Sequence, residues 1–358
     1  MKGEISGQLV NVFTRETYPA RIKWEDGIFT SIEELGRAPE HFIIPGLIDA
    51  HIHMESSLLC PSRFAELVVP RGTAATISDP HEMANVMGLA GINYMLRDAA
   101  KTPLRAFFTA PSCVPATQFE TSGASIGPKQ IDLLLRNPRV VALGELMNYP
   151  AVAKKDRRIM AKIAVAKKHR KKIDGHAPLV SGKDLNSYIS AGISSDHECT
   201  RLSEANEKAR LGMVIYVRES STAKNMRDLA HCKGTKCLVS DDVEPDDLLK
   251  HGHMDKLLRF AVENGIDPVD AVCMASINPS RHYSLKMDGI APGFPANFSI
   301  CDNLRFFNIR SVYISGKHVG EGGKPLFRAR PAKPVNIFRC TRKKPSVFII
   351  PITPKCWR

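Results

Sequence analysis

Two histidines separated by one residue follow an apolar run near the start of the chain. The run, residues 42–48, reads as a buried strand, and His51 and His53 come just after it. In an extended chain, residues i and i+2 project to the same side, so both imidazoles can reach one metal ion. Taken alone, the pair is only a weak indication of metal binding, and the interpretation depends on the ends of later strands.

Further residues of ligand type stand at the ends of those later candidate strands. They are Asp79, His81, Glu82, Glu145, His176, His197, Glu198, Glu219, Asp241 and Asp242. Taken singly, His176 and His197 read as core histidines, Glu145 as the partner of a lysine and Asp241 as a helix cap. Their coincidence at strand ends indicates a metal site instead.

Imidazole and carboxylate ligands suit Zn²⁺, Fe²⁺ and Mn²⁺. The four histidines suffice for one ion, and the addition of Glu145 and Asp241 suffices for two, with Glu145 positioned to bridge them. Two ions about 3.5–4 Å apart can make a shared water nucleophilic near neutral pH. Asp241 can then take the proton from this water and pass it to the leaving group. We therefore expect metal-assisted hydrolysis of a C–N bond.

Strand and helix patterns alternate through the middle of the chain. The expected strands are Ile43–His51, Thr73–Asp79, Arg105–Ala110, Val140–Glu145, Ile173–His176, Ile193–His197, Met213–Val217 and Lys236–Asp241. This alternation predicts eight parallel strands in a (β/α)₈ TIM-like barrel, which carries its chemistry at the carboxyl ends of the strands. A doubly wound sheet is the alternative, but no Gly-rich phosphate loop follows the first strand.

The helices expected between and after these strands follow the same alternation. They are Gly88–Ala99, Lys129–Arg136, Ala153–Lys172, Gly182–Ala191, Leu202–Leu211, Asp246–Glu263 and Pro268–Ala275, and Asn278-Pro279 is expected to stop the last one.

Short β segments separated by turn residues occur at both chain ends. We expect residues 1–42 and 285–325 to form one small composite, β-sandwich-like domain beside a metal-dependent hydrolase barrel over residues 43–284. Residues 326–358 are expected to form a basic, Pro-containing tail, in which residues 347–352 are a candidate strand.

The net charge of +13 is concentrated in two places. Ten Lys and Arg and no acidic residue occur from Gly322 onward, so the rest of the chain is near +3. The second cluster, residues 154–172, reads as the solvated face of an amphipathic helix. We expect no nucleic-acid binding and no membrane association, because no apolar run reaches the ~20 residues of a membrane span. Nine scattered cysteines and no signal-peptide pattern indicate a cytoplasmic protein.

Eight sequence runs resemble the adenine deaminase family of the amidohydrolase superfamily. They are PGLIDAHIHMESS, SDPHEMANVMG, GELMN, GHAP, SDHE, RESSTAKN, SDD and ASINPSRHYSL, and the resemblance covers about residues 3–320. It implies a binuclear Mn²⁺ or Fe²⁺ centre, with Zn²⁺ as an alternative, held by His51, His53, Glu145, His176, His197 and Asp241. The implied reaction is attack of water at C6 of adenine, which yields hypoxanthine and ammonia.

The resemblance also implies residues around the substrate. His81 and Glu82 would bind the purine or an accessory metal, and Glu55, Ser56, Arg218 and Glu219 would contact the purine or shape the mouth of the barrel. A homo-oligomer, expected to be a dimer, is implied as well. Family members commonly carry a further C-terminal domain, which the basic tail is expected to replace, and Val243-Glu244-Pro245 stands where the family usually places an arginine.

Two other functions stay open at this point. The first is a cyclic amidohydrolase that uses the same ligands on another heterocycle. The second is a catalytically impaired metal-binding barrel that lacks its last domain. A mechanism like that of the cytidine deaminases is excluded, because their P-C-x-x-C motif does not occur in the sequence.

Overall fold

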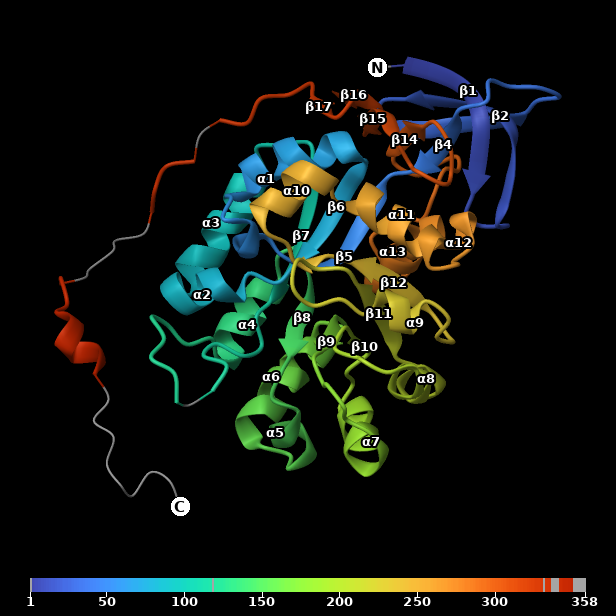
Figure 1. The fold of residues 1–358 in the computed structure, drawn as a ribbon. Helices are drawn as coiled ribbons and strands as arrows, with labels where there is room; N and C mark the ends of the chain where they lie inside the picture. The colour runs from blue at the N-terminus through green and yellow to red at the C-terminus, as the bar shows by residue number, and fades with distance from the viewer. Residues whose placement is uncertain (1, 118, 331, 336–340, 350–358) are drawn as a thin grey trace.

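The computed structural model describes residues 2–117, 119–330, 332–335 and 341–349. Its centre is a curled sheet of parallel strands with helices around it (Figure 1). The strands are β5 (Leu47–His53), β6 (Thr73–Ser78), β7 (Arg105–Ala110), β8 (Val140–Leu146), β9 (Lys172–Gly175), β10 (Ser195–Asp196), β11 (Val214–Arg218) and β12 (Lys236–Val239). The TIM-like fold predicted from the sequence is confirmed.

Backbone hydrogen bonds join these strands in chain order. Strands β5 to β9 pair in sequence, and so do β10 to β12. Between the two groups, the backbone N–H of Ser194 donates to the carbonyl of Ile173 at 3.0 Å. The short strand β13 (Asp241–Asp242) pairs with β5, which brings the end of the last strand beside the first.

The barrel strands are apolar because helices cover them on the outside and side chains fill the inside. Every residue of β5, β6 and β8 is buried. The surrounding helices are α1 (Pro61–Val68), α2 (His81–Met87), α3 (Leu89–Ala99), α4 (Pro128–Leu135), α5 (Tyr149–Ala153), α6 (Arg157–Lys168), α7 (Gly182–Ser190), α8 (Leu202–Arg210), α9 (Met226–Leu229), α10 (Pro245–His251), α11 (Met254–Glu263), α12 (Pro268–Met274) and α13 (Ile277–Tyr283).

Three helix predictions are wrong in detail. The helix expected over Ala153–Lys172 is shorter, because α6 begins only at Arg157, where the Asp156 carboxylate caps its start, and Ala153 is the last residue of α5. The stretch Asp246–Glu263 is divided at Gly252, whose φ of 90° ends α10. Asn278-Pro279 lies in the first turn of α13, where proline is tolerated, so it opens a helix and does not close one.

Both chain ends join in one eight-stranded sheet, which lies at one side of the barrel (Figure 1). Its strands, in spatial order, are β17 (Lys324–Pro325), β16 (Lys317–Glu321), β15 (Ile309–Ile314), β14 (Phe298–Cys301), β4 (Phe42–Pro45), β1 (Lys2–Asn11), β2 (Glu16–Glu25) and β3 (Ile28–Glu34). The Trp24 indole packs on Phe298 at a centroid distance of 5.1 Å and donates to the carbonyl of Gly316 at 3.0 Å. These contacts join the two ends.

The run expected as one strand over Ile43–His51 is two strands in two sheets. Strand β4 pairs with β1 and β14, whereas β5 belongs to the barrel. The chain passes between the sheets at Gly46, where a Cβ atom would lie 2.6 Å from that of Ala74. Residues 43–45 therefore pair within the sheet of the chain ends and not within the barrel.

The last described residues contain a 3-10 turn, η3 (Pro345–Phe348), where the sequence suggested the start of a strand. Residues 350–352 of that candidate strand lie outside the described residues. Among the helices of the described residues, none is long and apolar enough to cross a membrane.

Candidate metal centre

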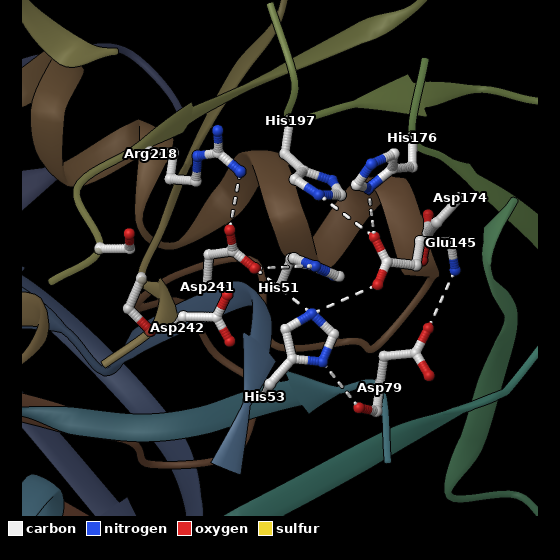
Figure 2. A network of polar contacts seen from close by, with 12 residues as sticks. His51, His53, Asp79, Glu145, Asp174, His176, His197, Arg218, Asp241 and Asp242 are labelled. Atoms are coloured by element: carbon white, nitrogen blue, oxygen red, sulfur yellow. Dashed lines mark hydrogen bonds and ion pairs between the residues drawn. The ribbon is translucent and has the colours of Figure 1, made fainter. Parts of the chain in front are cut away.

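Six side chains from the ends of five strands and the loops after them point toward one another at the carboxyl end of the barrel (Figure 2). They are His51 and His53 of β5, Glu145 of β8, His176 directly after β9, His197 directly after β10 and Asp241 of β13. Five of the six residues are buried, and His176 is partly exposed. The structure thus brings together all the candidate ligands that the sequence singled out.

The Glu145 carboxylate lies between two groups of histidines. Its Oε1 atom is 3.4 Å from Nε2 of His53. Its Oε2 atom is 2.7 Å from Nδ1 of His176 and 3.2 Å from Nε2 of His197. Because its two oxygens face opposite groups, this carboxylate can contact two cations at once.

Asp241 completes the group formed by the histidines of β5. Its Oδ1 atom lies 3.5 Å from Nε2 of His51 and 3.3 Å from Nε2 of His53, while Oδ2 accepts a 2.8 Å ion pair from Arg218. The backbone of Asp241 has φ of 55°, in the left-handed region that residues other than glycine rarely adopt. Such strain is commonly found at functional sites.

The electrostatics of this cluster favour ionised carboxylates. Burial raises the pKa of Glu145, but His176 and His197 outweigh this and hold its pKa well below the usual range. Burial likewise raises the pKa of Asp241, but the adjacent His51 and His53 outweigh this and hold its pKa well below the usual range. Burial lowers the pKa of His51, but Asp241 and Glu145 raise it overall to about 8. The site therefore holds buried negative charge that requires positive partners.

The donor atoms fit divalent cations. Several sets of three donor atoms lie within 4.8 Å of one another, among them His51 with His53 and Glu145, His51 with His197 and Asp241, and Glu145 with His176 and His197. Donor atoms that each lie 2.0–2.2 Å from the same cation must also lie within about this distance of one another. Both ring nitrogens of His51 are buried and make no hydrogen bond to a described residue, and Nε2 has only the 3.5 Å ion-pair contact with Asp241, so a bound cation would satisfy a group that is otherwise costly to bury.

A hydrogen bond fixes the orientation of His53. Its Nδ1 atom lies 3.0 Å from the carbonyl oxygen of Asp79, a distance at which Nδ1–H donates to the carbonyl. Nε2 is then left as the atom that faces Glu145 and Asp241. A backbone carbonyl in this role is the usual arrangement for a metal-binding histidine.

Three more predicted residues lie at the rim of the cluster. Nδ1 of His81 is 3.3 Å from Oε1 of Glu145, and Nε2 of His81 is 3.4 Å from Oε1 of Glu82. The Arg218 guanidinium contacts both Asp241 and Glu198. These three side chains therefore lie directly around the six inner groups.

The other three predicted residues are less central. Ser56 donates to Asp242 at 2.5 Å at an exposed position. Glu55 lines a cavity of about 320 Å³, and burial together with Glu82 raises its pKa to about 8. Glu219 has no described contact with the cluster, and the charges that act on it are Lys224 and Lys256. The structure therefore does not bring Glu219 to the centre.

Sequence reasoning counted two further residues among the ligand-type residues at strand ends but assigned neither of them a specific role. Oε1 of Glu198 lies 3.3 Å from Nε2 of His197, and Oδ2 of Asp79 accepts a hydrogen bond of 2.9 Å from the backbone of Glu145. Both residues stand at strand ends next to recognised ligands, which was the available signal.

The sequence profile of the amidohydrolase family matches residues 42–319, which contain the barrel strands and all six inner residues. The chain belongs to the amidohydrolase family. Its barrel and the chain-end sheet are therefore those of a family fold.

Curated relatives of this amidohydrolase are adenine deaminases. It is 54% identical over 324 residues to adenine deaminase of Methanothermobacter thermautotrophicus, an alignment that covers 90% of this chain and 60% of the relative. It is 50% identical to the enzyme of Methanosphaera stadtmanae, with 96% and 63% covered. The chain thus spans about three fifths of the length of these relatives.

Solved structures share the fold at low sequence identity. N-acetyl-D-glucosamine-6-phosphate deacetylase of Mycobacterium smegmatis superposes with a TM-score of 0.66 at 15% identity, covering 88% of this chain and 99% of that one. A mutant of atrazine chlorohydrolase of Arthrobacter aurescens gives 0.67 at 11% identity, covering 90% and 97%. These similarities support the fold of this amidohydrolase.

Proposed function

We propose that this amidohydrolase forms the metal-binding catalytic part of an adenine deaminase, which converts adenine and water to hypoxanthine and ammonia. The observation that carries the proposal is the convergence of the six inner side chains in a chain 54% identical to an adenine deaminase. The proposed ligands of one cation are His51, His53, Glu145 and Asp241. Those of the other cation are Glu145, His176 and His197.

Mn²⁺ or Fe²⁺ is the proposed metal, with Zn²⁺ as the alternative. Two such cations would supply positive charge and a water that is nucleophilic near neutral pH. Side chains of the protein are proposed to position the reacting groups and to transfer the proton. Glu145 holds the two groups of histidines at a fixed separation through its two oxygens.

Asp241 is the proposed carrier of the proton. Water adds to C6 of adenine, the C6–N bond breaks, and Asp241 moves a proton from the water to the departing amino group, so that ammonia leaves. Arg218 holds Oδ2 of Asp241 and so orients the carboxylate toward the histidines. Because Arg218 contacts one carboxylate oxygen of Asp241 and the histidines contact the other, Asp241 can accept and release the proton without a change of rotamer.

Four residues above the inner cluster are proposed to contact the purine. They are Glu55, Ser56, His81 and Glu82. Burial and the neighbouring Glu82 raise the pKa of Glu55, which favours a protonated carboxyl that can donate a hydrogen bond to a ring nitrogen. The polar groups of His81 and Glu82 can contact the purine edge, which provides selectivity for a base with matching donors and acceptors.

Assays of ammonia release test this proposal. The protein loaded with Mn²⁺ is expected to release ammonia from adenine, and guanine, cytosine, hydantoin and dihydroorotate serve as comparison substrates. Turnover of one of these and not of adenine would instead indicate a cyclic amidohydrolase of other specificity. Metal binding without any turnover would indicate a catalytically impaired barrel.

A homodimer and a cytoplasmic location are also proposed for this protein, and light scattering of the purified protein would test the dimer.

A further inference from the structure

A fully buried lysine lies behind the two histidines that follow β9 and β10. Lys208 of α8 has no exposed surface, although lysine is almost never buried unless it is paired. Its Nζ atom donates to the carbonyl of Ala177 at 2.7 Å, to Oε1 of Glu204 at 2.7 Å and to the carboxylate of Asp196. The three donor positions of the ammonium group are therefore all used.

The partners of Lys208 belong to the segments that carry His176 and His197. Ala177 directly follows His176, and Asp196 directly precedes His197. Oδ1 of Asp196 also accepts from the backbone of Glu198 at 2.9 Å and from that of Ala177 at 3.4 Å. Lys208 and Asp196 thus connect the two strand ends through backbone groups next to the histidines.

Glu204 extends this connection into the loops that follow. Its Oε1 atom accepts from the backbone of Leu179 at 2.8 Å, and its Oε2 atom accepts from that of Thr200 at 3.2 Å. Leu179 follows His176 and Thr200 follows His197, by three residues in each case. Both loops are therefore held by one carboxylate on α8.

We propose that Lys208, Asp196 and Glu204 form a buried clamp that positions His176 and His197 for one of the two cations. The inference rests on the proposed metal pair. The clamp touches no side chain of the other group, because its described bonds reach only the segments after β9 and β10. None of the proposed ligands of the second cation, His51, His53, Glu145 and Asp241, lies in the segments that Lys208 contacts.

Metal content is the direct readout of this clamp. Lys208→Met keeps the length of the side chain but removes the ammonium group, and Glu204→Gln keeps the shape but removes one charge. We expect wild-type protein to hold two Mn²⁺ per chain after dialysis. Lys208→Met is expected to hold one, and Glu204→Gln is expected to bind one of the two ions at least tenfold more weakly. Elemental analysis and chelator competition measure these quantities.

Double variants identify which cation is lost. Lys208→Met combined with His197→Ala is expected to hold as much metal as Lys208→Met alone, because both changes affect the same position. Lys208→Met combined with Asp241→Ala is expected to hold almost none. Lys101→Met is the control. Lys101 also pairs with a buried carboxylate, that of Asp98, but this pair lies at the end of α3, before β7. This control is expected to keep two ions.

Two results would overturn the clamp. One is the retention of both ions by Glu204→Gln with affinities within twofold of wild type, a measurement that does not depend on whether Lys208→Met folds. The other concerns the ion that Lys208→Met still binds. Loss of this ion on replacement of His197, together with its retention on replacement of Asp241, would contradict the clamp. If the proposed function is wrong, wild-type protein will bind two ions but will not turn over adenine. The metal content of the variants can still be measured in that case, so the clamp is tested separately from the function.

Discussion

The backbone N–H of Glu145 donates a hydrogen bond of 2.9 Å to Oδ2 of Asp79, so the end of β6 fixes the end of β8. Both residues are buried, and the bond leaves the Glu145 side chain free to face the histidines. Gly144 makes this close approach possible. A Cβ atom at that position would overlap the Asp79 carboxylate and lie 2.7 Å from Oγ1 of Thr109.

Gly144→Ala is therefore expected to displace Asp79 and, with it, the backbone of Glu145. Overpacking of a buried site typically costs about 1–3 kcal/mol, and misplacement of a catalytic group by about 1 Å can lower turnover by ~10²-fold. Turnover of adenine and bound metal should both be measured. Gly36→Ala is the control, because a Cβ atom there meets nothing within 4 Å. Equal activity of the two variants would contradict the role of this contact.

Replacement of Glu145 or Asp241 by alanine should abolish most of the activity. Each carboxylate contacts several histidines of the centre, so its removal affects both the binding of cations and the movement of the proton. We expect turnover to fall by about three orders of magnitude or more. Circular dichroism should show retained secondary structure. Near-full activity in either variant would show that the assignment of that residue is wrong.

Removal of divalent metal should inactivate and destabilise the protein. The nitrogens of His51, which make no hydrogen bond to a described residue, and the ionised carboxylates around them would be satisfied by bound cations. A ligand present at 100 times its Kd stabilises the folded state by about 2.7 kcal/mol. We expect chelation to lower Tm by about 5 °C, and addition of Mn²⁺ should restore both Tm and adenine turnover. Mg²⁺ at the same concentration is the control cation, since imidazole ligands suit it poorly.

The ends of the barrel strands could be predicted because buried parallel strands read as apolar runs that stop at polar residues. The expected strand Arg105–Ala110 coincides with β7. The division of the first apolar run at Gly46 could not be predicted in the same way. Hydrophobicity continues through residues 42–48 and does not indicate which sheet a residue joins.

The supporting residues of the site were harder to foresee than its inner residues. A histidine or glutamate at a strand end is recognisable from local sequence alone. Lys208 lies near the end of a helix, between Glu207 and Ala209 and two residues before Arg210, where a lysine normally reads as solvated. Its partner Asp196 is twelve residues away, and only the packing of α8 against the barrel brings them together.

Stability in acid should depend on Asp98, a buried carboxylate far from the metal centre. Its Oδ1 atom pairs with Lys101 at 2.6 Å and its Oδ2 atom accepts from the backbone of Ser62 at 2.8 Å, which ties α3 to the start of α1. Burial raises the pKa of Asp98, but Lys101 and Ser62 outweigh it and leave the pKa below its ordinary value of 3.8. A carboxylate with a lowered pKa stabilises the fold above that ordinary value, and the stabilisation is lost as the pH falls through the folded-state pKa.

Asp98→Asn keeps the shape of the side chain and removes this titration. We expect the variant to melt below wild type at pH 7, since a hydrogen bond to a charged group contributes about 1.5–3 kcal/mol. The difference in Tm should persist to pH 5 and narrow between pH 4 and pH 3, because protonated Asp98 in wild type then resembles the amide. Other acidic groups titrate in both proteins, so their effects on Tm cancel in the difference between Asp98→Asn and wild type. A gap in Tm that stays constant or widens toward pH 3 would contradict the lowered pKa.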